Sequence, residues 1–302
     1  MTGPKPEPPL SGPAGPPDSS IIRRVFPVLA LVTAASALGT SIVVPFMPLY
    51  ATTLGATGIW VGLVLAGFSI AQTVVMPFIG HWSDRYGRRL FLLVGLGGYA
   101  LLSLVYIWVA DPLQLVMVRL AHGFASGLVL PVARAWVGDV TPRGQEGTWQ
   151  GYYNTAWFGG MGAGPFLGGL LAEWFSLAAV FIVMSALSGL AFLVVVVWLK
   201  EGGPGRGTAQ RGLPIRGIAR SGVFTGVFSL RVLETTARQS FFSFLPIFAA
   251  AVLGLNVFQI GVLFSVNLAV TTVFQVPAGK LGDRTDRRLL IFWASLVGIV
   301  YM

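Results

Sequence analysis

Two ten-residue stretches of this chain share one pattern: GHWSDRYGRR at Gly80–Arg89, the first cassette, and GKLGDRTDRR at Gly279–Arg288, the second cassette. The shift of 199 positions that aligns them also places Gly55 on Gly254. Each cassette follows one apolar run of helix length and precedes another. The chain therefore contains two related halves, each beginning with two helices joined by a short basic loop. In membrane proteins, parallel repeats of this kind place a binding site at their interface.

The composition is too apolar for a soluble domain. Of the 302 residues, 55% are hydrophobic and only 10% are charged, and the mean hydropathy is +0.77. A soluble core of ordinary proportions cannot hide that much apolar surface. Several runs, such as 28–50 and 177–199, reach the roughly 20 residues that cross about 30 Å of hydrocarbon as helix. The short alternating segments of a membrane barrel are absent. An all-α protein in a lipid bilayer is predicted.

Basic residues are concentrated in alternate connections between the apolar runs. Sixteen of the twenty Lys and Arg residues lie in the N-terminal tail or in every second loop, and the loops between them carry none. This positive-inside pattern predicts a multi-pass protein of a cell inner membrane, with its N-terminus and both cassettes in the cytoplasm. The formal net charge of +9 would also suit nucleic acid, but the loop asymmetry explains it, and no nucleic-acid partner is expected.

Few residues are suited to metal or covalent chemistry. The chain has no cysteine, and its two histidines, His81 and His122, lie far apart on different predicted helices. No metal site, thiol chemistry or cofactor is therefore expected. No nucleophile-base pair or phosphate-binding loop stands out either, which argues against an enzyme.

Composition divides the chain into four regions. Residues 1–20 are rich in Pro, Gly and Ser and are predicted to form a disordered cytoplasmic tail. Residues 21–199 are the N-terminal six-helix bundle, the Gly- and Arg-rich stretch 200–220 is a cytoplasmic linker, and residues 221–302 are a partial C-terminal bundle. Helices are expected near 24–52, 58–80, 89–110, 113–138, 148–172, 176–199, 221–252, 257–279 and from 288 onward. About nine transmembrane helices are thus predicted, the last one cut short.

The six-helix bundle, the basic linker and the repeated G-x-x-x-D-R-x-G-R-R loop resemble the major facilitator superfamily. Two segments sharpen the resemblance: Arg119-Leu-Ala-His-Gly123 is similar to the family's R-x-x-x-G motif in helix four, and Gly160–Gly169 is similar to the glycine-proline motif of drug/proton antiporters in helix five. The resemblance covers about residues 24–302 and favours the twelve-helix antiporter group. It implies a major facilitator fold, and it implies that the sequence stops inside the ninth of twelve helices.

The resemblance also implies a cytoplasmic gate built from the cassettes and the end of helix four. Asp84 would dock against helix eleven of the opposite half, and Asp139 would pair with a cassette arginine, either Arg88 or Arg85. The gate residues expected on this basis are Gly80, Asp84, Arg85, Gly87, Arg88, Arg89, Asp139, Gly279, Asp283, Arg284, Arg287 and Arg288.

The cassette glycines are interpreted as positions that need a close backbone approach or a positive φ. This applies to Gly80 and Gly87, whereas the second cassette departs from the pattern by carrying Asp286 where the internal glycine belongs. A tight turn with anchoring arginines is the simpler alternative. The presence of two copies at matching positions weakens it.

The glycine-proline stretch of helix five is predicted to be a pivot. Small residues four apart allow close packing of membrane helices, and an internal proline allows a bend. Helix five would then slide against its partner in the other half, as alternating access requires. Close packing alone is the alternative. The pivot residues are Gly160, Gly164, Pro165, Gly168 and Gly169.

Several ionisable residues lie inside predicted helices. Arg119 is a turn or two from the outer boundary, so it either snorkels to that interface or faces the bundle interior, where it could meet an anion. Arg134, nearer the cytoplasm and close to Asp139, is interpreted as structural. Arg231, Glu234 and Arg238 follow spacings of three and four and can pair along helix seven. Glu234 is predicted near mid-membrane, either as a protonatable site or substrate counter-ion, or as one member of a salt-bridge ladder.

Polar and aromatic residues of other helices are candidates for lining a mostly apolar cavity. They are Gln72, Asn154, Trp157, Phe241, Phe242 and Phe244. The predicted function is proton-coupled export of drug-like or amphipathic small molecules by alternating access. Two alternatives stay open. One is transport of an organic anion or metabolite, because arginines outnumber Glu234 within the membrane, and the other is a truncated fragment that does not transport.

Overall fold

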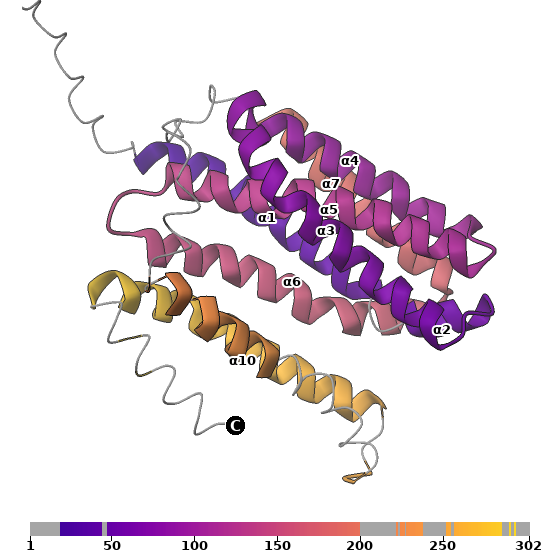
Figure 1. Cartoon of the computed structure of the whole chain (residues 1–302). Helices are drawn as coiled ribbons and strands as arrows, with labels where there is room; N and C mark the ends of the chain where they lie inside the picture. The colour runs from indigo at the N-terminus through magenta and orange to yellow at the C-terminus, as the bar shows by residue number, and fades with distance from the viewer. Residues whose placement is uncertain are drawn as a thin grey trace, which may run out of the picture.

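The computed structural model describes residues 19–43, 47–199, 222, 224–226, 228–237, 252–254, 257–285, 290 and 293. Within this part, every regular element is helical, which confirms the predicted fold class (Figure 1). The elements are α1 (Ser19–Val43), α2 (Met47–Thr53), α3 (Gly58–Tyr86), α4 (Arg88–Val105), the 3-10 turn η2 (Tyr106–Trp108), α5 (Pro112–Val140), α6 (Glu146–Trp174), α7 (Leu177–Trp198) and α10 (Val257–Arg284).

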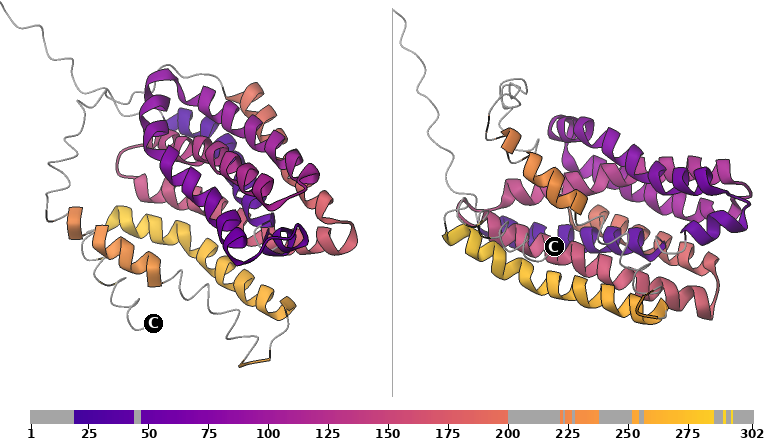
Figure 2. Two further views of the ribbon diagram at one scale, coloured as in Figure 1. Left: turned by 45° about the vertical axis from the view of Figure 1, so that its right-hand side comes forward. Right: turned by 60° about the horizontal axis from the view of Figure 1, so that its bottom comes forward.

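The long helices of the first half pack as one bundle, and α10 lies beside it. α3 packs on α5, α4 packs on α5 and α7, and α1 contacts α5, α6 and α7. α6 contacts α1 within the first half and α10 of the second half along much of its length, and the views agree on this arrangement (Figures 1 and 2). The contact between the halves in the described part of the chain is therefore mainly the contact of α6 with α10.

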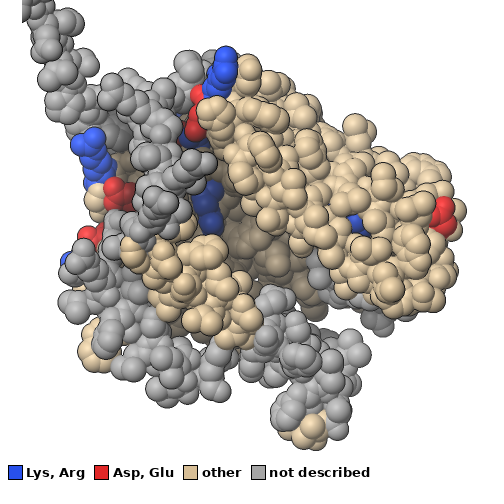
Figure 3. Space-filling model, in the orientation of Figure 1, with Lys and Arg blue, Asp and Glu red and all other residues tan. Residues whose placement is uncertain are grey.

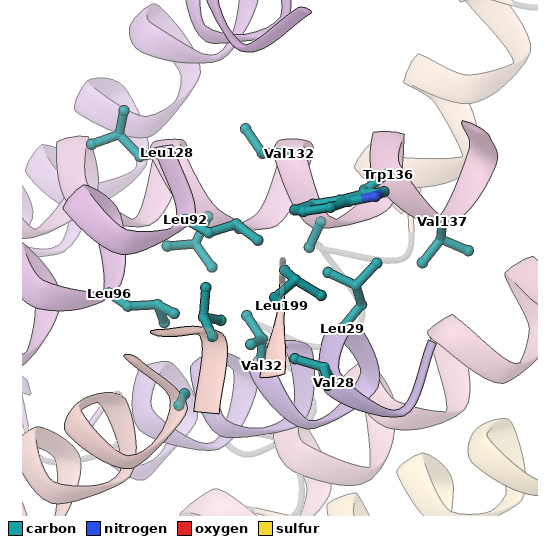
Figure 4. Close-up of a cluster of buried hydrophobic side chains, with 14 of the residues drawn as sticks. Val28, Leu29, Val32, Leu92, Leu96, Leu128, Val132, Trp136, Val137 and Leu199 are labelled. Carbon is teal, nitrogen blue, oxygen red and sulfur yellow. The ribbon is translucent and has the colours of Figure 1, made fainter. Parts of the chain in front are cut away.

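Two clusters of buried apolar side chains hold the first half together. The cluster near the first cassette joins α1, α4, α5 and the end of α7, and Figure 4 shows Trp136 and Val132 of α5 facing Leu92 and Leu29. The second cluster lies toward the other end of the bundle. There the rings of Tyr106 and Phe181 stack with their centroids 4.9 Å apart.

Close helix approach in this bundle depends on glycine. Gly123 of α5 faces the backbone of Phe68 in α3, and a Cβ at this position would overlap the Phe68 carbonyl. In a bilayer, lipid chains are as apolar as the side chains they contact, so association relies on packing and small residues let the backbones meet. This packing fixes α5, and the charged residues that it carries, against α3.

The internal repeat is visible in the backbone as well as in the sequence. Gly55, before α3, has φ of +84°, and Gly254, before α10, has φ of +65°. Residues with a Cβ rarely adopt this conformation. These glycines are paired by the same shift that aligns the cassettes. Each half therefore enters its cassette helix through a glycine turn.

The outward faces of the helices are apolar. Ile70 of α3, Leu101 of α4 and Val197 of α7 are more than half exposed, as expected of side chains that contact lipid. Five stretches of the described chain are long and apolar enough to span a membrane: Ile22–Val43, Gly58–Tyr86, Arg88–Trp108, Pro112–Val140 and Leu177–Trp198. α6 is as long as α3 but is not among them. It contacts α1 and α10, so less of its surface needs to suit lipid.

The first predicted helix has different boundaries from those expected. The prediction was one helix over 24–52, but α1 begins at Ser19, inside the predicted tail, and ends at Val43. A separate helix, α2, follows from Met47. The sequence carries Pro45 between them, and a proline ring both lacks an N–H and clashes with the preceding turn of a helix.

Other predicted regions lie partly or wholly outside the described residues. The linker 200–220 and the tail up to residue 18 are outside, as is the ninth helix apart from 290 and 293. Of the predicted helix 221–252, residues 222, 224–226 and 228–237 are described and helical. The third predicted helix, 89–110, is α-helical only to Val105 and then tightens into η2.

Candidate functional site

The first cassette joins α3 to α4 through one glycine and one buried arginine. Gly87 has φ of +94° and ends α3 directly before Arg88 begins α4. Arg88 is only 7% exposed, and its Nη2 lies 3.0 Å from Asp84 Oδ1 and 2.6 Å from Asp139 Oδ2. One guanidinium thus ties the ends of α3, α4 and α5 together. The end of the bundle that carries this cluster is called the cassette end below.

The arginine that pairs with Asp139 is therefore Arg88 rather than Arg85. Arg85 is exposed and lies 5.5 Å from the ring of Tyr86. Arg89 anchors α4 to α7 by donating from Nη2 to the Val196 carbonyl at 2.8 Å. Arg134, expected beside Asp139, is bonded elsewhere.

Only one of the two cassette glycines meets the expected requirement. Gly87 has a positive φ, but Gly80 lies within helix α3 with open space where a Cβ would stand among the described residues. The expectation of a close approach or positive φ is therefore wrong for Gly80 in this part of the chain. Its aligned counterpart Gly279 does face a backbone, that of Gly147 in α6.

The second cassette makes its contacts across the two halves. Asp283 Oδ1 accepts from the Gly147 N–H at 2.6 Å, and Asp283 Oδ2 accepts from the Thr148 N–H at 2.8 Å and the Thr148 hydroxyl at 2.7 Å. These donors belong to the first turn of α6, where free N–H groups and the helix dipole favour an anion. Arg284 is described and exposed, whereas Arg287 and Arg288 lie outside the described residues.

The glycines of α6 divide between two neighbours. Gly160 faces the Ala34 carbonyl and Gly164 faces Ser41, both in α1. The predicted sliding of these two glycines against the other half is therefore wrong, because they contact their own half. Gly147 and Gly151 are the glycines whose Cβ positions meet the backbone of α10. Of the other predicted pivot residues, Gly168 is buried, and Pro165 and Gly169 are partly buried.

A row of polar side chains crosses from α5 through α6 to α10. Arg134 Nη2 donates to Asn154 Oδ1 at 3.0 Å, and Asn154 Nδ2 donates to Gln275 Oε1 at 3.2 Å. About two turns along α6 from the residues that contact Asp283, Thr155 Oγ1 lies 3.5 Å from the Thr272 carbonyl. Asn154 was predicted as a cavity residue, whereas Gln275 was not.

The two other predicted cavity residues do not join this row. Gln72 Nε2 donates to Ser126 Oγ at 3.0 Å, between α3 and α5. Trp157 is partly buried on α6. Phe241, Phe242 and Phe244 lie outside the described residues.

Arg119 is buried inside the first half rather than extended to the outer boundary. It is 4% exposed, its Nε donates to the Val64 carbonyl at 3.1 Å, and its guanidinium carbon lies 4.7 Å from the Phe68 ring centre. Nearby, the Tyr106 hydroxyl and His122 Nδ1 are 3.0 Å apart. The snorkelling alternative is wrong for this structure.

The predicted coupling residue Glu234 forms a local ion pair. Arg231 Nη1 lies 2.6 Å from Glu234 Oε2, and these side chains are 72% and 51% exposed. The two residues are three apart in a helical segment, as the spacing predicted. Arg238 lies outside the described residues.

Comparison with known proteins finds one family whose profile covers most of the chain. The profile of the Major Facilitator Superfamily matches residues 29–302. The chain belongs to the Major Facilitator Superfamily. The resemblance found from the cassettes and helix motifs is thereby confirmed, and this is a superfamily of membrane transporters.

Relatives within the superfamily include drug-resistance proteins. An uncharacterized MFS-type transporter of Methanocaldococcus jannaschii is 26% identical over 91% of this chain and 72% of its own length. The multidrug resistance protein MdtG of Salmonella arizonae is 27% identical over 87% and 67%. The quinolone resistance protein NorA of Staphylococcus aureus is 31% identical over 54% of this chain, and the match spans only 42% of NorA.

A solved structure shares the fold. The crystal structure of the human organic anion transporter MFSD10 superposes with a TM-score of 0.63 over 85% of this chain and 72% of that chain, at 20% identity. At that identity the likeness concerns the fold alone.

The sequence predicted one residue of each contact between the halves but not the group that this residue binds. It named Asp283 but not the first turn of α6, and it named Asn154 but not Gln275. The available signal for the first was the repeat itself. If Asp84 is expected to dock on a helix of the other half, the aligned Asp283 should dock on a helix of the first half.

Proposed function

We propose that this protein is a secondary active transporter that exports drug-like or amphipathic small molecules in exchange for protons by alternating access. It would lie in a bacterial-type inner membrane with its N-terminus in the cytoplasm. The observation that carries the proposal is the contact of the two halves at the cassette end, where Asp283 of α10 caps α6. The names of MdtG and NorA support the substrate class.

In this proposal, the hydrogen bonds between Asp283 and the start of α6 hold the gate closed. Hydrogen bonds that involve a charged group contribute about 1.5–3 kcal/mol each in favourable settings, and a carboxylate at a helix N-terminus adds about 0.3–1 kcal/mol. Water competes for part-buried groups such as these, so the net stabilisation is smaller. A ligand or proton that favours the open state by a few kcal/mol then suffices to open the gate.

The backbone contact of Gly147 with Gly279 allows the gate to close tightly. Neither residue has a Cβ, and each would meet the other's backbone if it had one. At this point the two backbones meet with no side chain of either glycine between them. The halves can therefore rock about a central cavity, as transporters with repeated halves do.

The first cassette would hold the first half rigid while the gate works. Arg88 fixes the ends of three helices through Asp84 and Asp139. The resemblance also assigns Asp84 a second contact, with helix eleven of the opposite half. Gate closure would then involve both cassettes.

Proton coupling is assigned to Glu234, which pairs with Arg231. When Glu234 is protonated it no longer attracts Arg231, so the charge of this helix changes and one access state is favoured. Arg119 would contribute a buried positive charge in the first half. The substrate would occupy the space between the halves.

The test is transport by the product of the complete reading frame in proteoliposomes, with and without an imposed pH gradient. We expect gradient-driven accumulation of a cationic amphipathic dye. Glu234→Gln should lose the coupling to the gradient, and Glu234→Asp should retain part of it. Asp111→Asn, which removes one acid at the start of α5 and keeps an oxygen to cap that helix, serves as the control. Gradient-driven movement of carboxylates alone would favour the organic-anion alternative. If neither compound moves in response to the gradient, the proposal fails.

A further inference from the structure

Arg134 carries a positive charge that the described residues do not neutralise. It is exposed on α5, its Nη2 donates to the amide oxygen of Asn154, and its guanidinium carbon lies 5.2 Å from the ring centre of Tyr153. Asp139, the nearest acid along α5, is paired with Arg88 instead. Within the described part of the chain, the ion pairs found join other residues.

This charge lies well inside the cassette end of the bundle. Arg134 is six residues before the end of α5 at Val140, which corresponds to about 9 Å along the helix. A cation at that depth is costly unless it has a partner or faces a wet cavity, and it therefore indicates a functional site. Figure 3 shows a hollow on one face of the molecule with basic side-chain atoms inside it.

Side-chain amides of two other helices continue the row from the guanidinium. Arg134 has five N–H donors and Asn154 Nδ2 has two, of which the described contacts use one each. Gln275 belongs to α10 and its Oε1 accepts from Asn154, so its own NH2 group lies beside the Asn154 amide. Unused donors from α5, α6 and α10 therefore lie in one row, and a fork-shaped guanidinium matches a carboxylate better than a lone ammonium does.

We propose that Arg134, Asn154 and Gln275 bind the acidic group, a carboxylate or sulfonate, of an amphipathic compound that the protein transports. This inference rests on the proposed transport function and specifies that its amphipathic substrates include compounds that carry such a group. The apolar part of the compound would lie toward the middle of the membrane.

Binding at this site would also act on the contact between the halves. An acidic group is a stronger acceptor than the Asn154 amide oxygen, so its binding draws the guanidinium of Arg134 away from Asn154 Oδ1. Asn154 is the residue that bridges to Gln275 of the other half. Occupation of the site therefore changes a bond that holds α6 to α10, which is how a substrate can bias an access state.

The experiment measures binding to the purified product of the complete reading frame, with two probes that share the dansyl sulfonamide and differ by a carboxymethyl group: dansylglycine and dansylamide. Dissociation constants are obtained from dansyl fluorescence. The variants are Arg134→Gln, which keeps a donor but removes the charge, Arg134→Lys and Asn154→Ala. Arg143→Gln, in the exposed loop after α5, is the matched control for loss of one positive charge.

We expect Arg134→Gln to weaken dansylglycine binding on the order of tenfold, the effect of one charge-assisted hydrogen bond, with dansylamide binding unchanged. The dansylglycine affinity of Arg134→Lys should lie between those of the parent and Arg134→Gln. Equal losses for both probes, or unchanged dansylglycine binding in Arg134→Gln, would overturn the site. If dansylglycine binding depends on Arg134 but no gradient-driven transport is found, the proposed function is wrong and the binding site is supported. If gradient-driven transport is found but the probe affinities do not depend on Arg134, the binding site is wrong and the proposed function is supported.

Discussion

The two cassettes share a sequence pattern but make opposite kinds of contact. In the first cassette, Asp84 is 51% exposed and accepts from Arg88 four residues away. In the second, the aligned Asp283 accepts three hydrogen bonds from α6 of the other half. One copy therefore ties its own half together within the described residues, and the other copy ties the halves to each other. The shared sequence pattern does not decide the partner of each aspartate, because the two copies face different helices.

The aligned glycines show the same difference. Gly279 faces the backbone of Gly147, while Gly80 faces open space among the described residues. A side chain at the two positions should therefore have different consequences for the contact between α6 and α10.

The largest effect is expected from Gly279→Val. Two β-branched methyl groups at this position must displace the backbone of α6, so the halves cannot close at the cassette end, and transport should fall at least a hundredfold while the protein still inserts. Gly282→Val, three residues on, where a Cβ would meet none of the described residues, is the control. Initial rates of dye export in proteoliposomes measure both. Equal rates in the two variants would mean that α6 and α10 do not need to meet as closely as described.

A smaller effect is expected from Asp283→Asn, which should slow cross-linking between α6 and α10 about tenfold. The amide keeps an oxygen that can accept one hydrogen bond from the first turn of α6, but it loses the negative charge and one of its two acceptors. The measurement is disulfide formation in Thr155→Cys/Thr272→Cys, a pair across α6 and α10 in a chain with no other cysteine. Cross-linking should be slower in the Asp283→Asn background.

Asp84→Asn is the matched background for that measurement, because it changes the aligned residue. Its described partner lies in its own half, so the Thr155–Thr272 cross-link should form at nearly the parent rate. If Asp84→Asn slows cross-linking as much as Asp283→Asn does, both cassettes control the α6–α10 contact, and the two aspartates do not have different roles.

Arg88→Ala tests the local role of the first cassette and should act on stability more than on gating. Loss of a buried guanidinium leaves Asp139, itself 29% exposed, without its partner. Breaking a buried pair costs about 3–5 kcal/mol, and exposed pairs contribute about 0–1 kcal/mol. The partly exposed carboxylates here argue for about 2 kcal/mol. Thermal unfolding in detergent should show a lower midpoint, with the unfolding of Asp283→Asn as the comparison.

The sequence predicted the helical fold well because that information is local. Apolar length, glycine turns and basic loops each refer to one segment, so the bundle, its superfamily and most helix limits followed from them. Which faces meet is not local. Gly160 and Gly147 are equivalent as small residues on α6, but one faces α1 and the other faces α10. Only the packing of three helices decides between these neighbours.

For the same reason, the sequence did not predict which residues of the candidate site contact one another. Arg134 was interpreted as structural because Asp139 is close in sequence, yet five residues on a helix place two side chains on different faces. Arg88, distant in sequence, takes Asp139 instead. Asn154 was predicted from its residue type alone. Gln275 could have been predicted by asking which residue of the helix 257–279 lies at the same depth in the membrane as Asn154.

The smallest effects are expected at the aligned arginines that follow each cassette aspartate. Arg85 is exposed and contacts the ring of Tyr86 at 5.5 Å, and Arg284 is also exposed. Arg85 was one of the two arginines expected to pair with Asp139, and Arg88 forms that pair instead. Exposed cation–π contacts contribute about 0.5–1 kcal/mol, and most exposed substitutions change stability by less than about 0.5 kcal/mol. Arg85→Ala and Arg284→Ala should therefore transport within about twofold of the parent. If export by Arg85→Ala falls as far as export by Gly279→Val, Arg85 has a partner in the opposite half, and the first cassette also joins the two halves.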